Sequence, residues 1–281
     1  MKPLTYAALT GLLLSTTQLL AQKLTLKPSW ETDTTLRTPE CVLFDPASKV
    51  LFVSCINGSP KLENKSSYIA KVGLDGKVMQ MKFTDNLNST KGMGILGDKL
   101  YVTEMNQVAE IALTTGKIVN RYPIDGAKFL NDIAIDTKNG IIYVTDSGDS
   151  KLWSLTQGNA TLVMASTPLK GPNGLLFDDG QLLIGNGDGA LLSMNPTTKK
   201  VDILSKVTGG IDGIVSLGGK QYMVTEWGGK VWHIRADGTN ELLSDTSAGK
   251  INSADIGYNP ATQTLFVPTF YHNTVKAFSL K

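Results

Sequence analysis

The chain has 281 residues, 27 Lys and Arg against 25 Asp and Glu, and a formal net charge of +2. Its basic residues are scattered, which excludes the clustered basic face that nucleic-acid binding requires. With only two histidines and two cysteines, a zinc cage built from these residues is hardly available. We therefore expect no nucleic-acid partner and a small molecule as the ligand or substrate.

The first 21 residues have the pattern of a secretory signal peptide. A short basic start, Met1-Lys2, precedes an apolar run that ends at Ala21, after which we place the cleavage site. The alternative is a first hydrophobic helix of the fold. The run is too short to span a membrane, and no later segment approaches spanning length. The interpretation is an exported protein, periplasmic in a bacterium and otherwise secreted, with residues 22–281 as one domain and no membrane partner.

The rest of the chain repeats one pattern, in which a polar anchor residue precedes an apolar strand, a tight turn and a second strand. The clearest copy runs from Asn131 to Asp146 and has Asn139-Gly140 between its strands. This dipeptide predicts a tight hairpin turn, because both residues tolerate positive φ. The anchors of the six copies are Glu40, Lys91, Asn131, Asn173, Asp212 and Ala254, at steps of 51, 40, 42, 39 and 42 residues. A period of roughly 40–45 residues with about four strands per unit is typical of propeller blades. The sequence therefore predicts an all-β, six-bladed β-propeller with four-stranded blades.

Four strands can be assigned to a complete unit. In the third they are Ile133–Asp136, Ile141–Asp146, Lys151–Leu155 and Thr161–Ala165. The sixth unit supplies only three strands, the last of which is Thr274–Leu280. An open propeller would expose unpaired backbone groups. We therefore predict that the N-terminal strand, Leu24–Glu31, pairs with Thr274–Leu280 and completes the last blade.

Because strands alternate in direction, the anchors of all six inner strands are expected on one face around the axis. Glu40, Asn131, Asn173 and Asp212 bring two carboxylates and two amides together, the oxygen ligands that suit a hard divalent cation. Ca²⁺ would balance the two negative charges, with Mg²⁺ or Mn²⁺ as alternatives. Asn and Asp at strand starts also bond their own backbone in turns. We favour metal binding, because converging carboxylates repel one another without a cation.

Six repeats with this order of anchors resemble the gluconolactonase–regucalcin family of six-bladed propellers, over essentially the whole chain after the leader. The motifs that carry the resemblance are Pro39-Glu40, Asn131-Asp132, Gly171-Pro172-Asn173-Gly174 and Ile211-Asp212-Gly213. The resemblance implies a calcium-dependent hydrolase of lactones or related esters. It also implies that Glu40, Asn173 and Asp212 ligate the ion and that Asn131 ligates it or contacts substrate. Asp212 would also be the general base or nucleophile. The alternative is a non-catalytic propeller that binds a ligand or a protein partner and holds a structural metal.

Two anchor-region positions depart from the family pattern. Members that act on sugar-acid lactones carry an Arg two residues before the third-blade Asn, where this chain has Phe129. An apolar wall there argues against a highly hydroxylated substrate. Lys91 occupies the second anchor, where it either binds a substrate carboxylate or phosphate or packs its stem at the rim with its amine in water.

Loops that follow the second strands are expected to surround the mouth of the substrate pocket. The pocket candidates are Lys91, Glu104, Phe129, Asp146, Asn186, Glu226, Trp227 and Tyr271. Trp227 and Tyr271 would be apolar walls, and His272 is either a catalytic proton shuttle or a surface residue. Export permits a disulfide between Cys41 and Cys55. We favour two packed thiols, because directly opposed strand positions fit disulfide geometry poorly. A monomer is the favoured state.

Overall fold

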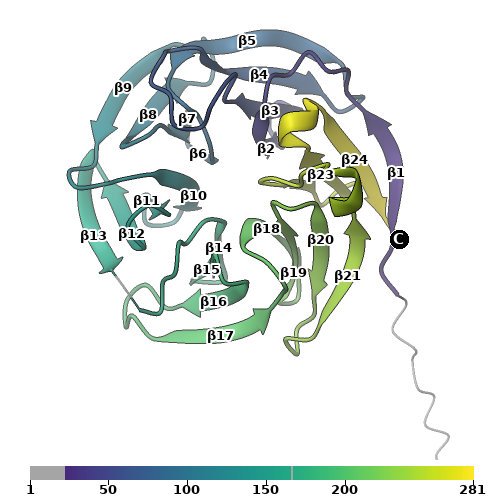
Figure 1. Cartoon of the computed structure of the whole chain (residues 1–281). Helices are drawn as coiled ribbons and strands as arrows, with labels where there is room; N and C mark the ends of the chain where they lie inside the picture. The colour runs from purple at the N-terminus through teal and green to yellow at the C-terminus, as the bar shows by residue number, and fades with distance from the viewer. Residues whose placement is uncertain (1–22, 166) are drawn as a thin grey trace, which may run out of the picture.

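The computed structural model describes residues 23–165 and 167–281, which form six four-stranded antiparallel sheets around an axis (Figure 1). The first strand of each of blades one to five lies next to the axis and the fourth lies on the rim. This arrangement confirms the prediction of an all-β, six-bladed propeller. The predicted signal peptide, residues 1–21, lies outside the described residues. None of the helices that the described residues form is long and apolar enough to cross a membrane.

From β2 onward, the strands follow the blades in order along the chain, whereas β1 belongs to blade six. Blades one to three contain β2 (Pro39–Asp45), β3 (Val50–Cys55), β4 (Ser67–Gly73), β5 (Val78–Leu87), β6 (Met93–Leu96), β7 (Lys99–Thr103), β8 (Gln107–Ala112), β9 (Ile118–Pro123), β10 (Leu130–Asp136), β11 (Ile141–Asp146), β12 (Lys151–Thr156) and β13 (Asn159–Ala165). Blades four to six contain β14 (Leu175–Asp178), β15 (Gln181–Gly185), β16 (Ala190–Met194), β17 (Val201–Lys206), β18 (Ile211–Gly218), β19 (Gln221–Glu226), β20 (Lys230–Ile234), β21 (Asn240–Asp245), β22 (Gly257–Asn259), β23 (Thr264–Pro268), β24 (Val275–Leu280) and β1 (Leu26–Glu31). Two 3-10 turns, η1 (Ser247–Gly249) and η2 (Phe270–His272), occur in the last third.

The ring closes where the two ends of the described chain meet. β1 pairs antiparallel with β24, with Leu26 opposite Leu280 and Glu31 opposite Lys276 (Figure 1). The indole Nε1 of Trp30 also donates a hydrogen bond to the backbone oxygen of Leu74 in blade one, at 2.8 Å. The predicted closing strand is therefore confirmed, and it contacts both blades that flank the closure.

The hairpin at Asn139-Gly140 has the predicted strand ends, and its two turn residues differ in conformation. β10 ends at Asp136 and β11 begins at Ile141, so four residues lie between the strands. Gly140 has a φ of 64°, whereas Asn139 is not in the left-handed region. The Asp136 carboxylate instead accepts hydrogen bonds from the Asn139 backbone N (3.1 Å) and Nδ2 (2.7 Å). Both residues tolerate positive φ, but only Gly140 adopts it, because the Asp136 side chain binds Asn139.

The hydrophobic core is divided among the spaces between neighbouring blades. Val53 and Ala70 of blade one pack in one cluster with Phe266 and Val275 of blade six. Tyr143 of blade three likewise belongs to a cluster with residues of blade four. Each blade therefore buries its apolar faces against two neighbours, which explains why the closed ring is needed for stability.

Three buried threonines on the second strands fix the anchors of the next blade. The hydroxyls of Thr103, Thr145 and Thr225 donate to the backbone oxygens of Asn131 (2.5 Å), Asn173 (2.8 Å) and Ala254 (2.8 Å). The Thr145 and Thr225 hydroxyls also accept from the backbone N of the residue after their own blade's anchor, each at 2.9 Å. The anchor ring is therefore positioned by contacts between blades as well as within them.

We expect Thr145→Val to lower the free energy of unfolding by about 1–3 kcal/mol, because it leaves buried backbone groups at Asp132 and Asn173 without their partner. Denaturant titration followed by circular dichroism would measure the loss. Thr197→Val, in an exposed turn, is the matched control. Equal midpoints for the two variants would contradict this role.

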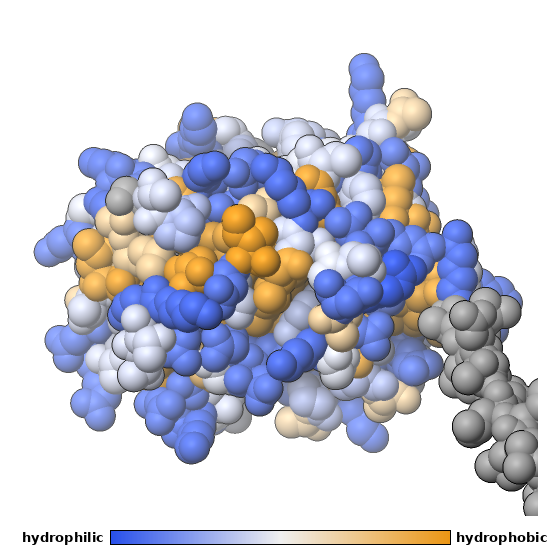
Figure 2. All heavy atoms as spheres, turned by 90° about the horizontal axis from the view of Figure 1, so that it is seen from below, coloured by the Kyte–Doolittle hydropathy of each residue, from blue (hydrophilic) through white to orange (hydrophobic). Residues whose placement is uncertain are grey.

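The wall of the disc carries apolar side chains among hydrophilic ones (Figure 2). On rim strand β17, Ile203 is 70% exposed and Leu204 is also exposed. Asp202 and Lys206, both exposed, flank this pair. Charges beside an apolar edge hinder pairing with a strand of another chain.

Candidate metal centre at the hub

Side chains from several inner strands converge on the axis at one face of the disc. Glu40 lies on β2, Asn131 on β10 and Asp212 on β18, and all three are buried. Asn173 lies two residues before β14, and its Nδ2 donates to Asp212 Oδ1 over 2.6 Å. The structure therefore joins Asn173 directly to Asp212.

Two of the four predicted ligands have buried oxygen atoms without a hydrogen-bond partner, Glu40 Oε2 and Asn131 Oδ1. The other end of the Asn131 amide is engaged, because its Nδ2 donates to Ser147 Oγ at 3.1 Å. Leaving a buried acceptor unpaired costs about 1–3 kcal/mol. A hard cation would satisfy both oxygens, so these residues fit such an ion.

Acidic side chains alone do not form a cation site in this ring. Across residues 23–165 and 167–281, no group of three or more His, Cys, Asp and Glu side chains is arranged to hold a metal. An ion at the hub would therefore need the amide oxygens of Asn131 and Asn173 as well as the carboxylates. This mixed ligand set is the one that the sequence predicts.

A second layer of acids lies one residue further along the inner strands, at Asp132 and Asp255. The Asp132 carboxylate accepts from the backbone N of Ile133 and of Leu175, both at 2.6 Å. Asp255 N donates to Glu40 O at 2.9 Å, which links blade six to blade one. Sequence reasoning did not assign a role to either residue.

Glycines at the equivalent positions of other blades make room for this layer. A Cβ on Gly92 would lie 2.2 Å from Asp132 Oδ1, and one on Gly213 would lie 2.8 Å from Asp255 Oδ1. A residue with a side chain at Gly92 would therefore displace Asp132. The presence of Gly after three of the anchors and of Asp after two others is the sequence signal that could have identified this second layer.

The buried acids have strongly raised pKa values. Burial raises the pKa of Asp212 to about 7, although the hydrogen bond from Asn173 acts to lower it. Burial also raises the pKa of Asp132 to about 8. Burial, followed by the charges of neighbouring acids, also holds the pKa of Glu40 and of Asp255 well above the usual range. Burial at the hub therefore disfavours the charged forms of these acids, and a divalent cation would favour them.

Lys91 is the basic residue of the ring, and its side chain is only 2% exposed. Its Nζ donates to the backbone oxygen of Ser89 (3.0 Å) and to Ser89 Oγ (3.2 Å), and it lies 4.1 Å from the centroid of the Phe129 ring. Burial lowers the pKa of Lys91 to about 8, while the charge of Glu40 opposes this shift. Of the two alternatives for Lys91, the rim lysine with its amine in water is therefore wrong.

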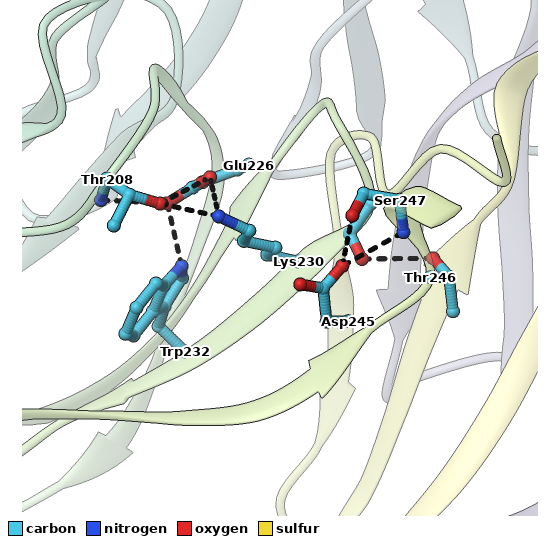
Figure 3. A network of polar contacts seen from close by, with 8 residues as sticks. Thr208, Glu226, Lys230, Trp232, Asp245, Thr246 and Ser247 are labelled. Carbon is cyan, nitrogen blue, oxygen red and sulfur yellow. Dashed lines mark hydrogen bonds and ion pairs between the residues drawn. The ribbon is translucent and has the colours of Figure 1, made fainter. Parts of the chain in front are cut away.

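Four predicted pocket residues at the ends of second strands bind backbone instead. Glu104, Asp146, Asn186 and Glu226 are buried, and each accepts an N–H from the loop leading into its own blade. The donors are Asn88, Lys128, Lys170 and Thr208 respectively. Figure 3 shows this arrangement at Glu226, which also accepts from Trp232 Nε1. These side chains hold the loops of the anchor face in place, so their oxygens are engaged.

Trp227 and Tyr271 differ from these four, because they are 43% and 59% exposed. His272 is also exposed, and no described residue forms a hydrogen bond with its ring. The structure thus places the two predicted apolar walls at the surface of the molecule, and it places His272 beside Tyr271 in η2.

Both cysteines are free and buried. Cys41 lies opposite Ser54, and Cys55 lies opposite Pro39, so the two are not directly opposed as the sequence had indicated. They belong to different core clusters. The bulge between Pro39 and Cys41 changes the register, and the thiols pack separately.

The axis below the anchors is open. A cavity of about 320 Å³ is lined by inner-strand residues of all six blades, with Cys41, Asp132 and Asp255 among apolar side chains such as Ile133 and Ile214. Part of this lining is shared with a second cavity of about 510 Å³. The hub is therefore not plugged by packed hydrocarbon.

Six four-stranded blades around a polar hub define the class of protein, a six-bladed β-propeller. The chain matches no protein-family profile and no curated protein sequence. Among solved structures it is similar to a proposed gluconolactonase, with 15% identity, a TM-score of 0.67, and 91% of this chain and 94% of that chain covered. It is also similar to virginiamycin B lyase from Staphylococcus aureus, with 16% identity, a TM-score of 0.65, and coverage of 92% and 99%. A chain of a nidogen/laminin complex has 14% identity and a TM-score of 0.66, with coverage of 76% and 86%. At these identities the likeness establishes the fold alone.

Proposed function

We propose that this protein is a divalent-metal-dependent hydrolase of lactones or related esters, with Ca²⁺ as the preferred ion. Glu40, Asn131, Asn173 and Asp212 would hold the ion. The observation that carries the proposal is the pair of buried, unpartnered oxygens on Glu40 and Asn131, in the same ring as the bonded pair Asn173 and Asp212. The similar fold of a proposed gluconolactonase adds support.

The residues of the ring are suited to the hydrolysis of a carbonyl compound. A bound divalent cation would polarise the substrate carbonyl and offset the negative charge that develops on its oxygen. Asp212 is the buried carboxylate of this ring that we assign to take a proton from an attacking water. Asn173 fixes one Asp212 oxygen and leaves the other for the ion or the water. Phe129 offers no hydrogen bond to a polyhydroxylated substrate, which favours a less polar one.

The alternative is a binding propeller with a structural ion, since the fold also occurs in a nidogen/laminin complex. Fold alone does not choose between these functions. A panel of lactones and aryl esters tests the proposal. We expect turnover that is lost with a chelator and returns with Ca²⁺. A folded, calcium-loaded protein that hydrolyses no member of the panel would favour the binding alternative.

Lys91 provides a further prediction about ion binding. The charge of its buried ammonium lowers the pKa of Glu40, and the charge of Glu40 raises the pKa of Lys91. The Lys91 ammonium should therefore also repel a cation held by the ring. We expect Lys91→Met to bind Ca²⁺ more tightly, by about tenfold, because one nearby positive charge is removed. Isothermal titration calorimetry would measure this change, with the exposed Lys220→Met as the control. Unchanged or weaker affinity in Lys91→Met would contradict the prediction.

A further inference from the structure

Three aromatic side chains form a cluster between blades five and six, which we call the aromatic platform. Trp227, in the loop after β19, meets Phe270 and Tyr271 of η2 edge to face, with ring centroids 5.5 and 6.0 Å away. The Phe270 and Tyr271 rings are 4.7 Å apart. Phe270 is buried, whereas the rings of Trp227 and Tyr271 remain partly open to solvent.

The platform borders the anchor ring. Glu226, directly before Trp227, pairs with Ile211, the neighbour of Asp212, so the Trp227 loop lies at the anchor end of blade five. Asn273, directly after η2, accepts a hydrogen bond from the backbone N of Thr38 at 2.8 Å, two residues before Glu40. The platform therefore lies on the anchor face, beside the strands that carry Glu40 and Asp212.

Contacts around Ala254 join the two halves of the platform. Ala254 packs with Phe270 and Ile56 in a small buried cluster. The backbone oxygen of Trp227 accepts from Asn252 Nδ2 at 2.9 Å, two residues before Ala254. Ala254 is the sixth anchor and brings no polar side chain to the ring, and its burial under Phe270 ties the platform to the inner end of blade six.

The arrangement is held in a conformation that is intrinsically unfavourable. Phe270 has a φ of 50°, which is uncommon for a bulky residue and costs free energy. Reciprocal bonds between Thr269 and Thr274 close the turn around η2, at 2.9 and 3.0 Å. A strained turn that keeps large rings exposed beside a polar hub is typical of a ligand contact.

We propose that the aromatic platform is a subsite for an aromatic ring of the substrate, so that the enzyme prefers aryl-fused lactones and aryl esters to polyhydroxylated lactones. This inference rests on the proposed hydrolase function. A flat ring placed on Trp227 and Tyr271 gains edge or offset contacts and displaces water from apolar surface. The reacting carbonyl then faces the ring of Glu40, Asn173 and Asp212.

Two δ-lactones with and without a fused benzene ring, dihydrocoumarin and δ-valerolactone, test this subsite. We compare the full chain with the double variant Trp227→Ala/Tyr271→Ala. We expect kcat/KM for dihydrocoumarin to fall about 30-fold and that for δ-valerolactone to change less than about twofold, from the contribution of two aromatic contacts. Comparison within each substrate cancels the intrinsic reactivity of the phenol leaving group. Trp227→Phe/Tyr271→Phe should restore most of the loss, and Ile203→Ala on the distant rim is the control.

Binding of the corresponding lactams, dihydroquinolinone and δ-valerolactam, separates this inference from the proposed function. Calorimetry should show that the full chain binds dihydroquinolinone more tightly and that the double variant loses this preference. If that result holds while no lactone is hydrolysed, the hydrolase proposal fails and the subsite stands. If both lactones are hydrolysed and the double variant slows them equally, or not at all, the subsite is overturned and the hydrolase proposal survives.

Discussion

Replacing Asp212 with Asn is expected to abolish lactone turnover, by about 10²–10⁴-fold in kcat, while the propeller remains folded. The change removes the buried carboxylate that receives a hydrogen bond from Asn173 and that we assign to both ion binding and proton transfer. It also removes a negative charge that raises the pKa of Glu40. The ion-free variant is therefore expected to unfold at a higher temperature than the ion-free parent at pH 8.

Activity, Ca²⁺ affinity and melting temperature should be measured on the same preparations. Asp85→Asn is the matched control, because Asp85 is exposed on rim strand β5 and makes no assigned contact with the hub. We expect it to behave like the parent in all three measurements. If the Asp212→Asn variant retained parental turnover, Asp212 would not be a catalytic residue.

Removing divalent cations is expected to make stability strongly dependent on pH. The folded protein holds the pKa of Asp212 at about 7 and that of Asp132 at about 8, above the usual value of 3.8. Between these values the folded state binds more protons than the unfolded state, so the free energy of unfolding falls as pH rises. The stability present below about pH 4 is therefore lost progressively up to about pH 8.

Thermal unfolding in chelator should therefore show a melting temperature about 10 °C lower at pH 8 than at pH 5. Saturating Ca²⁺ should cancel most of this difference, because an ion that binds only the folded state stabilises it and offsets the carboxylate charge. Mg²⁺ at the same concentration tests the preference for calcium. A melting temperature that is flat with pH in chelator would mean that the hub acids do not destabilise the folded protein.

The blades were predictable because their signal is repeated. Each anchor is followed by an apolar run, and six copies at a nearly constant spacing specify six units, even though any one copy is weak. The β11 bounds agree residue by residue with the predicted second strand of the third unit. The closing strand β1 followed from counting, since the last unit lacked one strand and an open edge is unfavourable.

The sequence did not predict which group each buried polar side chain binds. Glu104 and Glu226 stand where a ligand contact is plausible, yet both bind backbone N–H groups of nearby loops. Asp136 similarly binds Asn139, which does not adopt a positive φ. Which partner a carboxylate chooses depends on distances of a few ångströms between loops, and residue order does not contain that information.

The pairing of β1 with β24 also has a consequence for synthesis of the protein. The first strand of the propeller has its partner in the last strand, so the final blade cannot assemble until the ribosome has released β24. Blades one to five can form in turn as the ribosome releases them, and the apolar surface shared by blades six and one stays uncovered until then. A chain truncated before Val275 would therefore lack the last step of assembly and be a natural target for chaperones and proteases.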